Sequence, residues 1–320
     1  GLMLAVVLAA GRGKRLHPLT DRRSKGMLPV VGKPMIERVL DMAAQGGADR
    51  FVVVVHPEDG ALMEHLGRCS GEDRLRWAYQ ARRWGMAHAL ECAVPLIRED
   101  GGAEFLLASC DNLYPDGHVA ALVHGRREAD LDATLTLLRV RPEQIPTLAV
   151  VALQGDRVTD LVEKPRPEEA PSDWGVPALY ALSTRVLDYL PQVPVSVRGE
   201  RDFPDALRLL IAAGGRVGGV PVPWRLTLTN PADLLALNRH ILRRDPTRVT
   251  VPVGLPADVE VLPPVDIEAG VSLGSGCRIG PEVYLEAGAG IGAGAVVRRA
   301  VVLQDGRVPA GTVVADGVVG

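Results

Sequence analysis

The last quarter of the chain carries an apolar residue at every sixth position, and this period constrains the fold more than any other feature of the sequence. The series consists of Val249, Leu255, Val261, Ile267, Leu273, Ile279, Leu285, Ile291, Val297 and Leu303. A second series of apolar or small residues follows four positions later, and glycines stand at the turns. Six-residue repeats of this kind build a parallel β-helix, in which each repeat forms one flat face and stacks on its neighbours. We therefore predict a β-helix domain of hexapeptide repeats over residues 249–320.

The preceding part of the chain has a different texture, in which short apolar runs alternate with helical segments. We predict strands at residues 4–10, 51–55, 75–79, 105–108, 133–139, 158–162 and 178–182, and helices after Pro34 and at residues 87–97, 119–127 and 205–213. This alternation is typical of an α/β domain with a Rossmann-like mixed, mainly parallel sheet flanked by helices. We assign it residues 1–242. Ligands of such sheets bind beyond the carboxyl ends of the strands.

Composition excludes several classes of function. The chain has 320 residues, 47% of them hydrophobic and 23% charged, and no apolar run approaches the roughly 18 residues of a membrane span. Its formal charge of −3 provides no basic field for nucleic acid. The four cysteines are scattered without metal-type spacing, which favours a reducing cytoplasm over a disulfide scaffold. The first residues lack the basic segment of a signal peptide. We expect a cytoplasmic protein without membrane or nucleic-acid partners.

A glycine-rich turn follows the first predicted strand and is surrounded by cations. Gly11 and Gly13 allow backbone N–H groups to approach a phosphate without obstruction by a Cβ atom. The segment lacks the third glycine of a dinucleotide-binding turn and the lysine-serine ending of a P-loop. Five cations crowd one loop here, namely Lys14, Arg15, Arg22, Arg23 and Lys25. Several of them could neutralise a triphosphate, and the alternative is a solvated basic loop.

Residues 8–36 resemble the signature of the sugar nucleotidyltransferases, written L-A-A-G-x-G-x-R-L-x-P-L-T, then P-K, then L-P-V-x-G-K-P-x-I. The resemblance covers most of residues 2–240 and points to the glucose-1-phosphate thymidylyl- and uridylyltransferases, whose β-helix tails are left-handed. It implies that the turn holds the nucleotide and that two cations contact the reacting phosphates. The implied nucleotide-binding residues here are Leu8, Ala10, Gly11 and Gly13, and the implied catalytic residues are Arg15 and Lys25.

Three later segments resemble the same family in the same order. Gln80 and Gly85 resemble the base-reading residues of the thymidylyl and uridylyl members, and an amide complements a pyrimidine edge, which favours UTP or dTTP. Asp111 resembles the metal-binding aspartate, and a hard carboxylate oxygen suits Mg²⁺. Glu163 and Lys164 resemble the pair that holds the sugar and its phosphate.

These residues imply a reaction that needs no covalent nucleophile from the protein. An oxygen of a sugar 1-phosphate attacks the α-phosphorus of a nucleoside triphosphate in line, and pyrophosphate leaves. Both reactants are anions, so cations and magnesium must hold them together and stabilise the developing charge. We assign Arg15 and Lys25 to the transferred and leaving phosphates, Lys164 to the sugar phosphate, and Asp111 to catalysis as the magnesium ligand.

The resemblance fails at several positions. Thr227 stands where the family has its second metal-binding aspartate, and Asp233 more plausibly belongs to the first turn of a helix. Ser24 replaces a proline, Cys110 a glycine, and Ala149 a glycine of a third segment. A catalytically weak regulatory or nucleotide-sugar-binding subunit with the same fold is therefore the alternative function.

The tail favours assembly over a second chemistry. The last histidine of the chain is His240, so the tail contains none. Histidine is the usual general base of an acyltransferase, and its absence argues against acyl transfer by the tail. An apolar β-helix face makes a homo-oligomer the expected assembly. The sugar stays open, because pocket shape rather than sequence pattern distinguishes one sugar from another.

Overall fold

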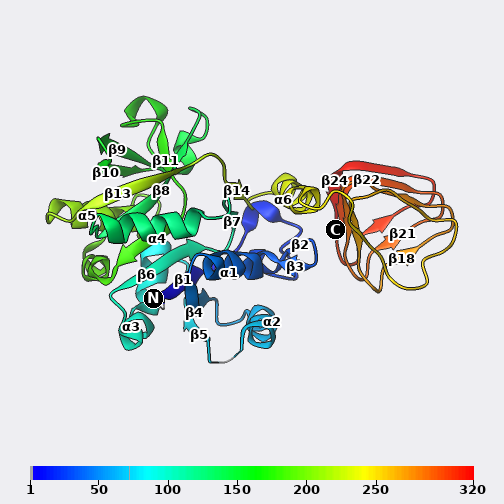
Figure 1. Cartoon of the computed structure of the whole chain (residues 1–320), viewed down its shortest axis with the longest axis horizontal. Helices are drawn as coiled ribbons and strands as arrows, with labels where there is room; N and C mark the ends of the chain where they lie inside the picture. Colours follow the sequence, from blue (N-terminus) through cyan, green and yellow to red (C-terminus); the bar gives the residue numbers. More distant parts are fainter. Residues whose placement is uncertain (1–2, 72) are drawn as a thin grey trace. The chain divides into compact units, whose positions relative to one another are not determined.

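The structure is a computed structural model that describes residues 3–71 and 73–320, and its contacts divide them into two compact units (Figure 1). The α/β unit comprises residues 3–11 and 36–225, and the repeat unit comprises residues 12–35 and 226–320. The glycine-rich turn is thus divided between them, because residues 12–35 make most of their contacts with the C-terminal part of the chain. The two units are defined by contacts, whereas the predicted domains, residues 1–242 and 249–320, are continuous stretches of the chain. The predicted domain boundary therefore stays a prediction.

The α/β unit alternates strands and helices along most of its length. Its helices are α1 (Met35–Gln45), α2 (Gly60–Ser70), α3 (Met86–Asp100), α4 (His118–Glu128), α5 (Phe203–Ala212), and the 3₁₀ segments η3 (Ile145–Thr147), η4 (Pro167–Glu169) and η5 (Thr184–Gln192). Its strands are β1 (Met3–Leu8), β4 (Ala48–Val55), β5 (Leu75–Tyr79), β6 (Glu104–Ser109), β7 (Asn112–Leu113), β8 (Ala133–Arg139), β9 (Ala149–Gln154), β10 (Arg157–Glu163), β11 (Trp174–Val176), β12 (Leu179–Ser183) and β13 (Val217–Val222).

The main sheet is mixed, in the order β11-β9-β10-β13-β8-β12-β6-β1-β4-β5. The block β6-β1-β4-β5 is parallel, and so is the pair β13–β8. The predicted mixed sheet is confirmed, but the expectation that it is mainly parallel is wrong, because the other strands pair antiparallel. β9 and β10 pair antiparallel because only Gly155 and Asp156 connect them, and a two-residue turn can join only antiparallel neighbours. β12 lies antiparallel between β6 and β8.

Helices cover both faces of this sheet. One face packs α3, α5 and η5 against a continuous apolar cluster that includes Leu135 and Leu137 of β8. Residues of a strand alternate between the two faces, so Thr136 of β8 points to the opposite one. There its hydroxyl contacts Nε2 of His118 from α4 at 2.9 Å. The α/β unit is therefore a three-layer structure, with the sheet between two helical layers.

The repeat unit contains stacked parallel strands. Its elements are η1 (Lys14–Leu16), η2 (Lys25–Met27), β2 (Pro29–Val30), β3 (Lys33–Pro34), β14 (Leu226–Thr227), α6 (Pro231–Arg243), β15 (Val249–Thr250), β16 (Glu260–Val261), β17 (Val265–Ile267), β18 (Ser272–Leu273), β19 (Arg278–Ile279), β20 (Val283–Leu285), β21 (Gly290–Ile291), β22 (Val296–Val302), β23 (Arg307–Val308) and β24 (Val313–Val319). Ile267 pairs with Leu285, and Leu273 pairs with Ile291. The partners are thus three six-residue repeats apart, as stacked coils of such repeats require.

The predicted period slips by one residue near the end of the chain. Leu285 pairs with Val302, not with Leu303, because one coil there is a residue shorter. The interior of the stack still contains the predicted apolar series, and Ile279, Val283 and Val297 are fully buried. The parallel strands agree with the predicted β-helix, while its left-handed sense stays a prediction.

Helix α6 begins as the sequence predicts. The side chain of Asn230 accepts a hydrogen bond from the N–H of Asp233 at 2.9 Å, and the Asp233 carboxylate accepts one from the N–H of Asn230 at 3.2 Å. This reciprocal capping satisfies two N–H groups that the first turn would leave without partners. Asp233 therefore has the helix-capping role predicted for it. Among the residues that the structure describes, no helix is both long and apolar enough to span a bilayer.

Candidate functional site

In the α/β unit, the predicted nucleotide-binding segment lies at the carboxyl edge of the parallel block. The N–H of Ala9 donates to the carbonyl oxygen of Val54 at 2.7 Å, directly after β1. The N–H of Cys110 donates to Leu8 at 3.0 Å, which places the end of β6 beside the end of β1. The N–H of Gln80 donates to the carbonyl of Val55 at 2.9 Å. The structure therefore brings residues 8–11, Gln80 and Asp111 to one edge of the sheet, where ligands of α/β proteins bind.

Gln80 is buried and its amide has a fixed orientation. Its Nε2 donates to the carbonyl oxygen of Gly85 at 3.2 Å and contacts Nδ1 of His88 at 2.9 Å. The His88 ring packs against Trp84 with ring centroids 5.0 Å apart. His88 thus orients the amide that is predicted to read the base, a role that the sequence pattern does not indicate. Gln80 and His88 are eight residues apart, and no pattern in the sequence indicates that their side chains are in contact.

Gly85 is required by the backbone around it. Its φ of 97° is unfavourable for any residue with a side chain. A Cβ atom there would lie 2.5 Å from the carbonyl oxygen of Arg201. That carbonyl accepts a hydrogen bond from the N–H of Ala87 at 3.0 Å, at the start of α3. Gly85 therefore lets the chain pass close to residue 201 while its own carbonyl contacts Gln80.

Arg83 fixes the glycine-rich turn. Its Nε donates to the carbonyl oxygen of Ala10 at 2.6 Å. This bond orients the peptide before Gly11 within the α/β unit. A Cβ at Gly11 would meet nothing within 4 Å, so the space beside the turn is open to a ligand. Arg83 lies between Gln80 and Gly85 but is not one of the residues that the resemblance names, and only the tertiary structure reveals its contact with Ala10.

Asp111 follows β6 and is held by its neighbours. Its Oδ1 accepts hydrogen bonds from the hydroxyl of Ser109 at 2.7 Å and from Nδ2 of Asn112 at 3.1 Å. Oδ1 of Asn112 in turn accepts from Arg225 at 3.4 Å. A carboxylate that neighbouring hydrogen bonds hold in one orientation is a good magnesium ligand. Mg²⁺ commonly binds only one or two protein carboxylates, and substrate phosphates supply other ligands. The donor set therefore fits the ion predicted for it.

Glu163 ends strand β10, Lys164 follows it directly, and the two form a second group. Burial and the nearby Asp202 carboxylate raise the pKa of Glu163 to about 7. Asp202 is itself buried and accepts a hydrogen bond from Arg198. Lys164 has a positive φ of 46°, and its N–H donates to the carbonyl of Leu148 at 3.0 Å. The exposed Lys164 side chain thus sits on a strained backbone position, a feature that clusters at functional sites.

The remaining predicted residues lie in the repeat unit, on a segment that we call the cation loop (residues 12–35). Gly13 has a φ of 64°, and its carbonyl accepts a hydrogen bond from the hydroxyl of Thr20 at 3.0 Å. A Cβ at Gly13 would lie 3.2 Å from the Cβ of Lys25. Gly13 therefore allows the loop to fold tightly beside Lys25, while Arg15 is exposed on η1.

Of the five cations that the sequence places beside the glycine-rich turn, Arg22 and Arg23 are engaged elsewhere in the repeat unit. Arg23 donates two hydrogen bonds to the carboxylate of Glu286, at 2.8 and 2.7 Å. Arg22 donates to Asp305 at 3.2 Å. Several of the five were predicted to neutralise a triphosphate, and Arg22 and Arg23 are already paired with carboxylates. The two cations assigned to the reaction, Arg15 and Lys25, are not in those pairs.

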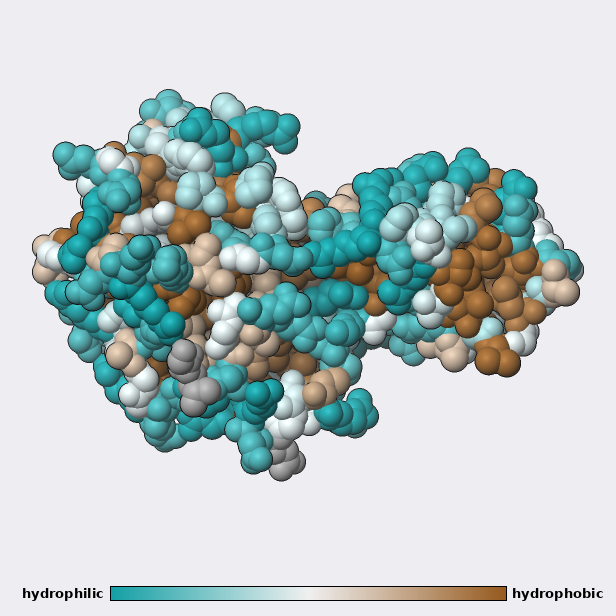
Figure 2. All heavy atoms as spheres, viewed as in Figure 1, coloured by the Kyte–Doolittle hydropathy of each residue, from teal (hydrophilic) through white to brown (hydrophobic). Residues whose placement is uncertain are grey.

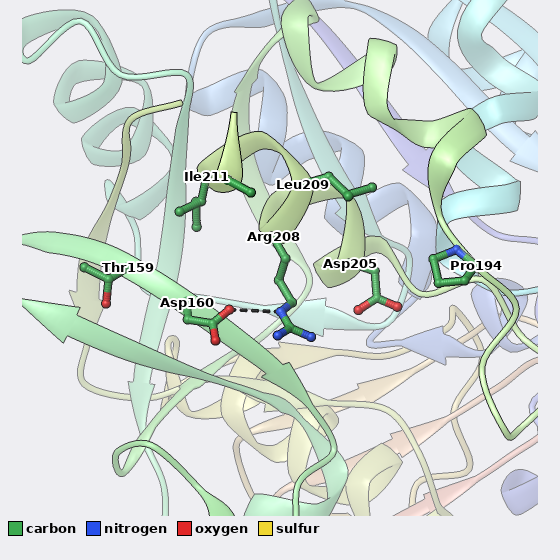
Figure 3. Close-up of a pocket in the computed structure, with 8 residues that line it drawn as sticks. Thr159, Asp160, Pro194, Asp205, Arg208, Leu209 and Ile211 are labelled. Carbon is green, nitrogen blue, oxygen red and sulfur yellow. Dashed lines mark hydrogen bonds and ion pairs between the residues drawn. The ribbon is translucent and has the colours of Figure 1, made fainter. Parts of the chain in front are cut away.

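A hollow of about 580 Å³ lies between β10 and α5, lined by residues that include Thr159, Pro194 and Leu209 (Figure 3). The Nε of Arg208 donates to the Asp160 carboxylate at 2.9 Å there. This ion pair neutralises the one arginine of the lining, and Asp205 adds a second carboxyl group. The hollow is thus poorly suited to a phosphate, and it contains no residue that the sequence analysis assigned to the site.

A glycine turn, a buried amide and an oriented carboxylate at the carboxyl edge of a parallel block define an α/β enzyme of the nucleotide-binding class. The family model described as "Nucleotidyl transferase" matches residues 4–222. The chain therefore belongs to the nucleotidyl transferase family, and it is an enzyme of the sugar-1-phosphate nucleotidyltransferase type, as the resemblance implied.

Curated relatives agree with this assignment, and solved structures agree with the fold. The UTP–glucose-1-phosphate uridylyltransferase AglF of Haloferax volcanii is 32% identical over 233 residues, which cover 72% of this chain and 93% of AglF. The bifunctional protein GlmU of Methanococcus maripaludis is 30% identical over 246 residues, but the chain spans only 55% of GlmU. A crystal structure of UDP-glucose pyrophosphorylase with UDP-glucose matches 76% of this chain with a TM-score of 0.66 and 20% identity, a likeness of fold.

Proposed function

We propose that this chain transfers the nucleotidyl group of UTP or dTTP to a sugar 1-phosphate and releases pyrophosphate, with Mg²⁺ as cofactor. An oxygen of the sugar phosphate forms the new bond to the α-phosphorus, and the bond from this phosphorus to the β-phosphate oxygen breaks. The departing pyrophosphate keeps the electron pair. No proton transfer to the protein is needed in this step, so binding and charge stabilisation supply the catalysis.

The buried amide of Gln80 is the observation that carries the choice of a pyrimidine. A uracil or thymine edge presents a ring N–H between two carbonyl groups, and an amide oxygen can accept from that N–H. Gly85 and His88 take both hydrogens of Nε2 and hold the amide in place, so its Oε1 is preorganised as an acceptor before the base arrives. AglF, a relative at 32% identity, is a UTP-dependent enzyme by name, which supports the same choice.

The other groups have roles that follow from their charge and position. The carbonyl of Ala10, fixed by Arg83, orients the turn beside which the nucleotide would bind. Asp111 would hold magnesium, which when bound neutralises charge on the triphosphate. Glu163 would accept hydrogen bonds from sugar hydroxyls, and Lys164 would bind the sugar phosphate. Arg15 and Lys25 would contact the transferred and leaving phosphates.

The test is pyrophosphate release from each of UTP, dTTP, CTP, GTP and ATP against a panel of sugar 1-phosphates, with Mg²⁺ and with chelator. We expect Mg²⁺-dependent release with UTP or dTTP. Asp111→Asn should lower kcat by at least 100-fold, and the matched change Asp116→Asn, on an aspartate outside the assigned site, should not. Turnover that prefers a purine nucleotide would contradict the role of Gln80, and turnover in chelator would contradict that of magnesium.

The alternative is a regulatory subunit that binds the nucleotide sugar and turns over little, and Thr227 is the observation that favours it. A threonine hydroxyl is a weak magnesium ligand compared with a carboxylate. If one ligand is missing, Thr227→Asp should lower the Mg²⁺ concentration for half-maximal activity several-fold. Nucleotide binding without pyrophosphate release in the wild type, together with turnover in Thr227→Asp, would establish the regulatory role.

A further inference from the structure

Three side chains on two neighbouring helices of the α/β unit bring a carboxylate, an imidazole and a thiol together. Glu37 belongs to α1, and His65 and Cys69 belong to α2. Nε2 of His65 lies 2.9 Å from Oε2 of Glu37 and 3.6 Å from Sγ of Cys69. All three donor atoms lie within 4.8 Å of one another. None of these residues belongs to the nucleotidyl-transfer site described above.

The distance between His65 and Cys69 matches that between two ligands of a tetrahedral zinc ion. Zinc bonds of about 2.0–2.3 Å place neighbouring nitrogen, oxygen and sulfur ligands roughly 3.3–3.7 Å apart. The 3.6 Å between His65 and Cys69 falls within this range. The 2.9 Å between His65 and Glu37 is a few tenths of an ångström shorter, a gap that a small side-chain rotation opens. Residues four apart on one helix face, such as His65 and Cys69, can bind one ion without moving the backbone.

The donor chemistry selects the metal. Thiolate and imidazole ligands favour Zn²⁺ and bind Mg²⁺ poorly, because Mg²⁺ prefers oxygen. The side chains of Glu37 and His65 are 19% and 25% exposed, so two ligands are partly shielded. Cys69 is exposed, which leaves a path for the ion and for a water ligand. We propose that Glu37, His65 and Cys69 form a zinc site that joins α1 to α2, with water in the fourth position.

A hydrogen-bonded ion pair between His65 and Glu37 is the alternative. That pair needs only the imidazole and the carboxylate, and Cys69 would then be dispensable. A zinc site needs the thiolate, because sulfur supplies one of three protein ligands. The contribution of Cys69 to binding therefore separates the two arrangements. Cys69 is also the only one of the three ligands whose bond to the metal would give a thiolate-to-metal absorption band.

Cobalt(II) is the probe that tests this site. The full-length protein is freed of metal with chelator and titrated with Co²⁺, which replaces zinc but absorbs light. We expect one equivalent to produce a near-ultraviolet thiolate-to-cobalt band and the visible bands of a tetrahedral ion, both displaced by Zn²⁺. Cys69→Ser should remove the near-ultraviolet band and weaken binding at least tenfold. The matched control Cys92→Ser, another partly exposed helical cysteine, should keep both.

Stability provides a second measurement that does not depend on catalysis. A ligand that binds only the folded state raises the melting temperature, so Zn²⁺ should raise that of the wild type and not that of Cys69→Ser or His65→Ala. Retained circular dichroism and pyrophosphate release would show that the variants fold. Absence of the thiolate band, or a band unchanged in Cys69→Ser, would overturn the proposal while leaving nucleotidyl transfer untouched.

Discussion

Glu163, which we propose binds the sugar, lies where its ionised form lowers the stability of the fold. A free glutamate titrates near 4.5, whereas burial and Asp202 raise the pKa of Glu163 to about 7. Between these values the folded state binds more protons than the unfolded state, so stability falls as the pH rises through this window. The difference corresponds to about 3 kcal/mol, which partial solvent access reduces to roughly 1–2 kcal/mol. Above pH 7 the carboxylate is therefore ionised and destabilises the fold. The ionised form can accept hydrogen bonds from the sugar hydroxyls proposed as its partners.

We predict that Glu163→Gln stabilises the substrate-free protein at high pH. At pH 8 the variant should exceed the wild type by roughly 1–2 kcal/mol in its free energy of unfolding, because the penalty for a buried charge is gone. At pH 5 the difference should nearly vanish. Urea unfolding at both pH values measures it, and exposed Glu168→Gln is the control. An equal effect at the two pH values would show that the pKa of Glu163 is not raised.

Gly85 gives a second prediction at this scale. Gly85→Ala introduces a Cβ 2.5 Å from a backbone oxygen at a φ of 97°, so the chain before α3 must shift. We expect a loss of about 2–4 kcal/mol in the free energy of unfolding. We also expect a higher KM for the nucleotide, since the Gly85 carbonyl orients Gln80. Gly60→Ala, where a Cβ meets nothing within 4 Å, is the matched control. An unchanged KM for the nucleotide would show that Gly85 has no part in recognition of the base.

Among the elements, the cation loop depends most on distant sequence. The side chains of Arg23 and Glu286 are only 22% and 13% exposed, and Oε1 of Glu286 also accepts from the N–H of Gln304 at 2.7 Å. Asn238 of α6 accepts from the N–H of Val31 at 2.8 Å and donates to the carbonyl of Pro29 at 3.2 Å. The repeat unit thus holds the loop at both a charged and a buried polar contact.

Because Glu286 of the repeats anchors the cation loop, we predict that it affects the reaction by positioning the loop. Glu286→Gln should lower kcat about tenfold with a smaller change in the KM of the sugar phosphate, because Lys25 lies two residues from Arg23. The exchanged pair Arg23→Glu with Glu286→Arg should recover part of the loss that each change causes alone. Glu260→Gln, which removes an exposed ion pair of the repeats with Arg278, is the control. An additive double mutant would mean that the pair does not position the loop.

Elements with a strong pattern were predictable from the sequence, and elements defined by packing were not. The predicted bounds of β5 and β8 are confirmed at both ends because their apolar runs stop at clear breaks. β13 was missed because it contains Gly218 and Gly219, which are unfavourable in strands. A Cβ at Gly219 would lie 2.4 Å from Leu137, so the neighbouring strand requires glycine there. Such a requirement is invisible until the neighbour is known.

The site shows the same division. Residues named by the family resemblance, such as Gln80 and Asp111, lie at the predicted edge of the sheet, and their roles stay predictions. Arg83, His88 and Asp202 were missed, because each acts through a tertiary contact with another residue's backbone or side chain. The spacing of His65 and Cys69 is visible in the sequence, but Glu37 is 28 residues before His65 and only the packing of two helices brings it near.

At the scale of the whole molecule, the repeat unit presents an apolar face. Figure 2 shows hydrophobic side chains gathered on one side of the repeats. A shallow pocket of about 530 Å³ in these repeats is lined by residues that include Pro252, Val253, Leu255 and Val271. Val253 is fully exposed. Apolar surface of this kind commonly marks a contact with another protein, and a copy of the same chain is the simplest partner.

We therefore expect a homo-oligomer that associates through the repeats, and a single charge should weaken it. Val253→Glu buries a carboxylate if this face forms the contact, so the complex should dissociate at protein concentrations where the wild type is assembled. Light scattering after size-exclusion chromatography measures the mass of each species. Val197→Glu is the matched control, because this valine is equally exposed but lies in the α/β unit. A wild-type monomer would refute the assembly, and an oligomer that survives Val253→Glu would place the contact elsewhere.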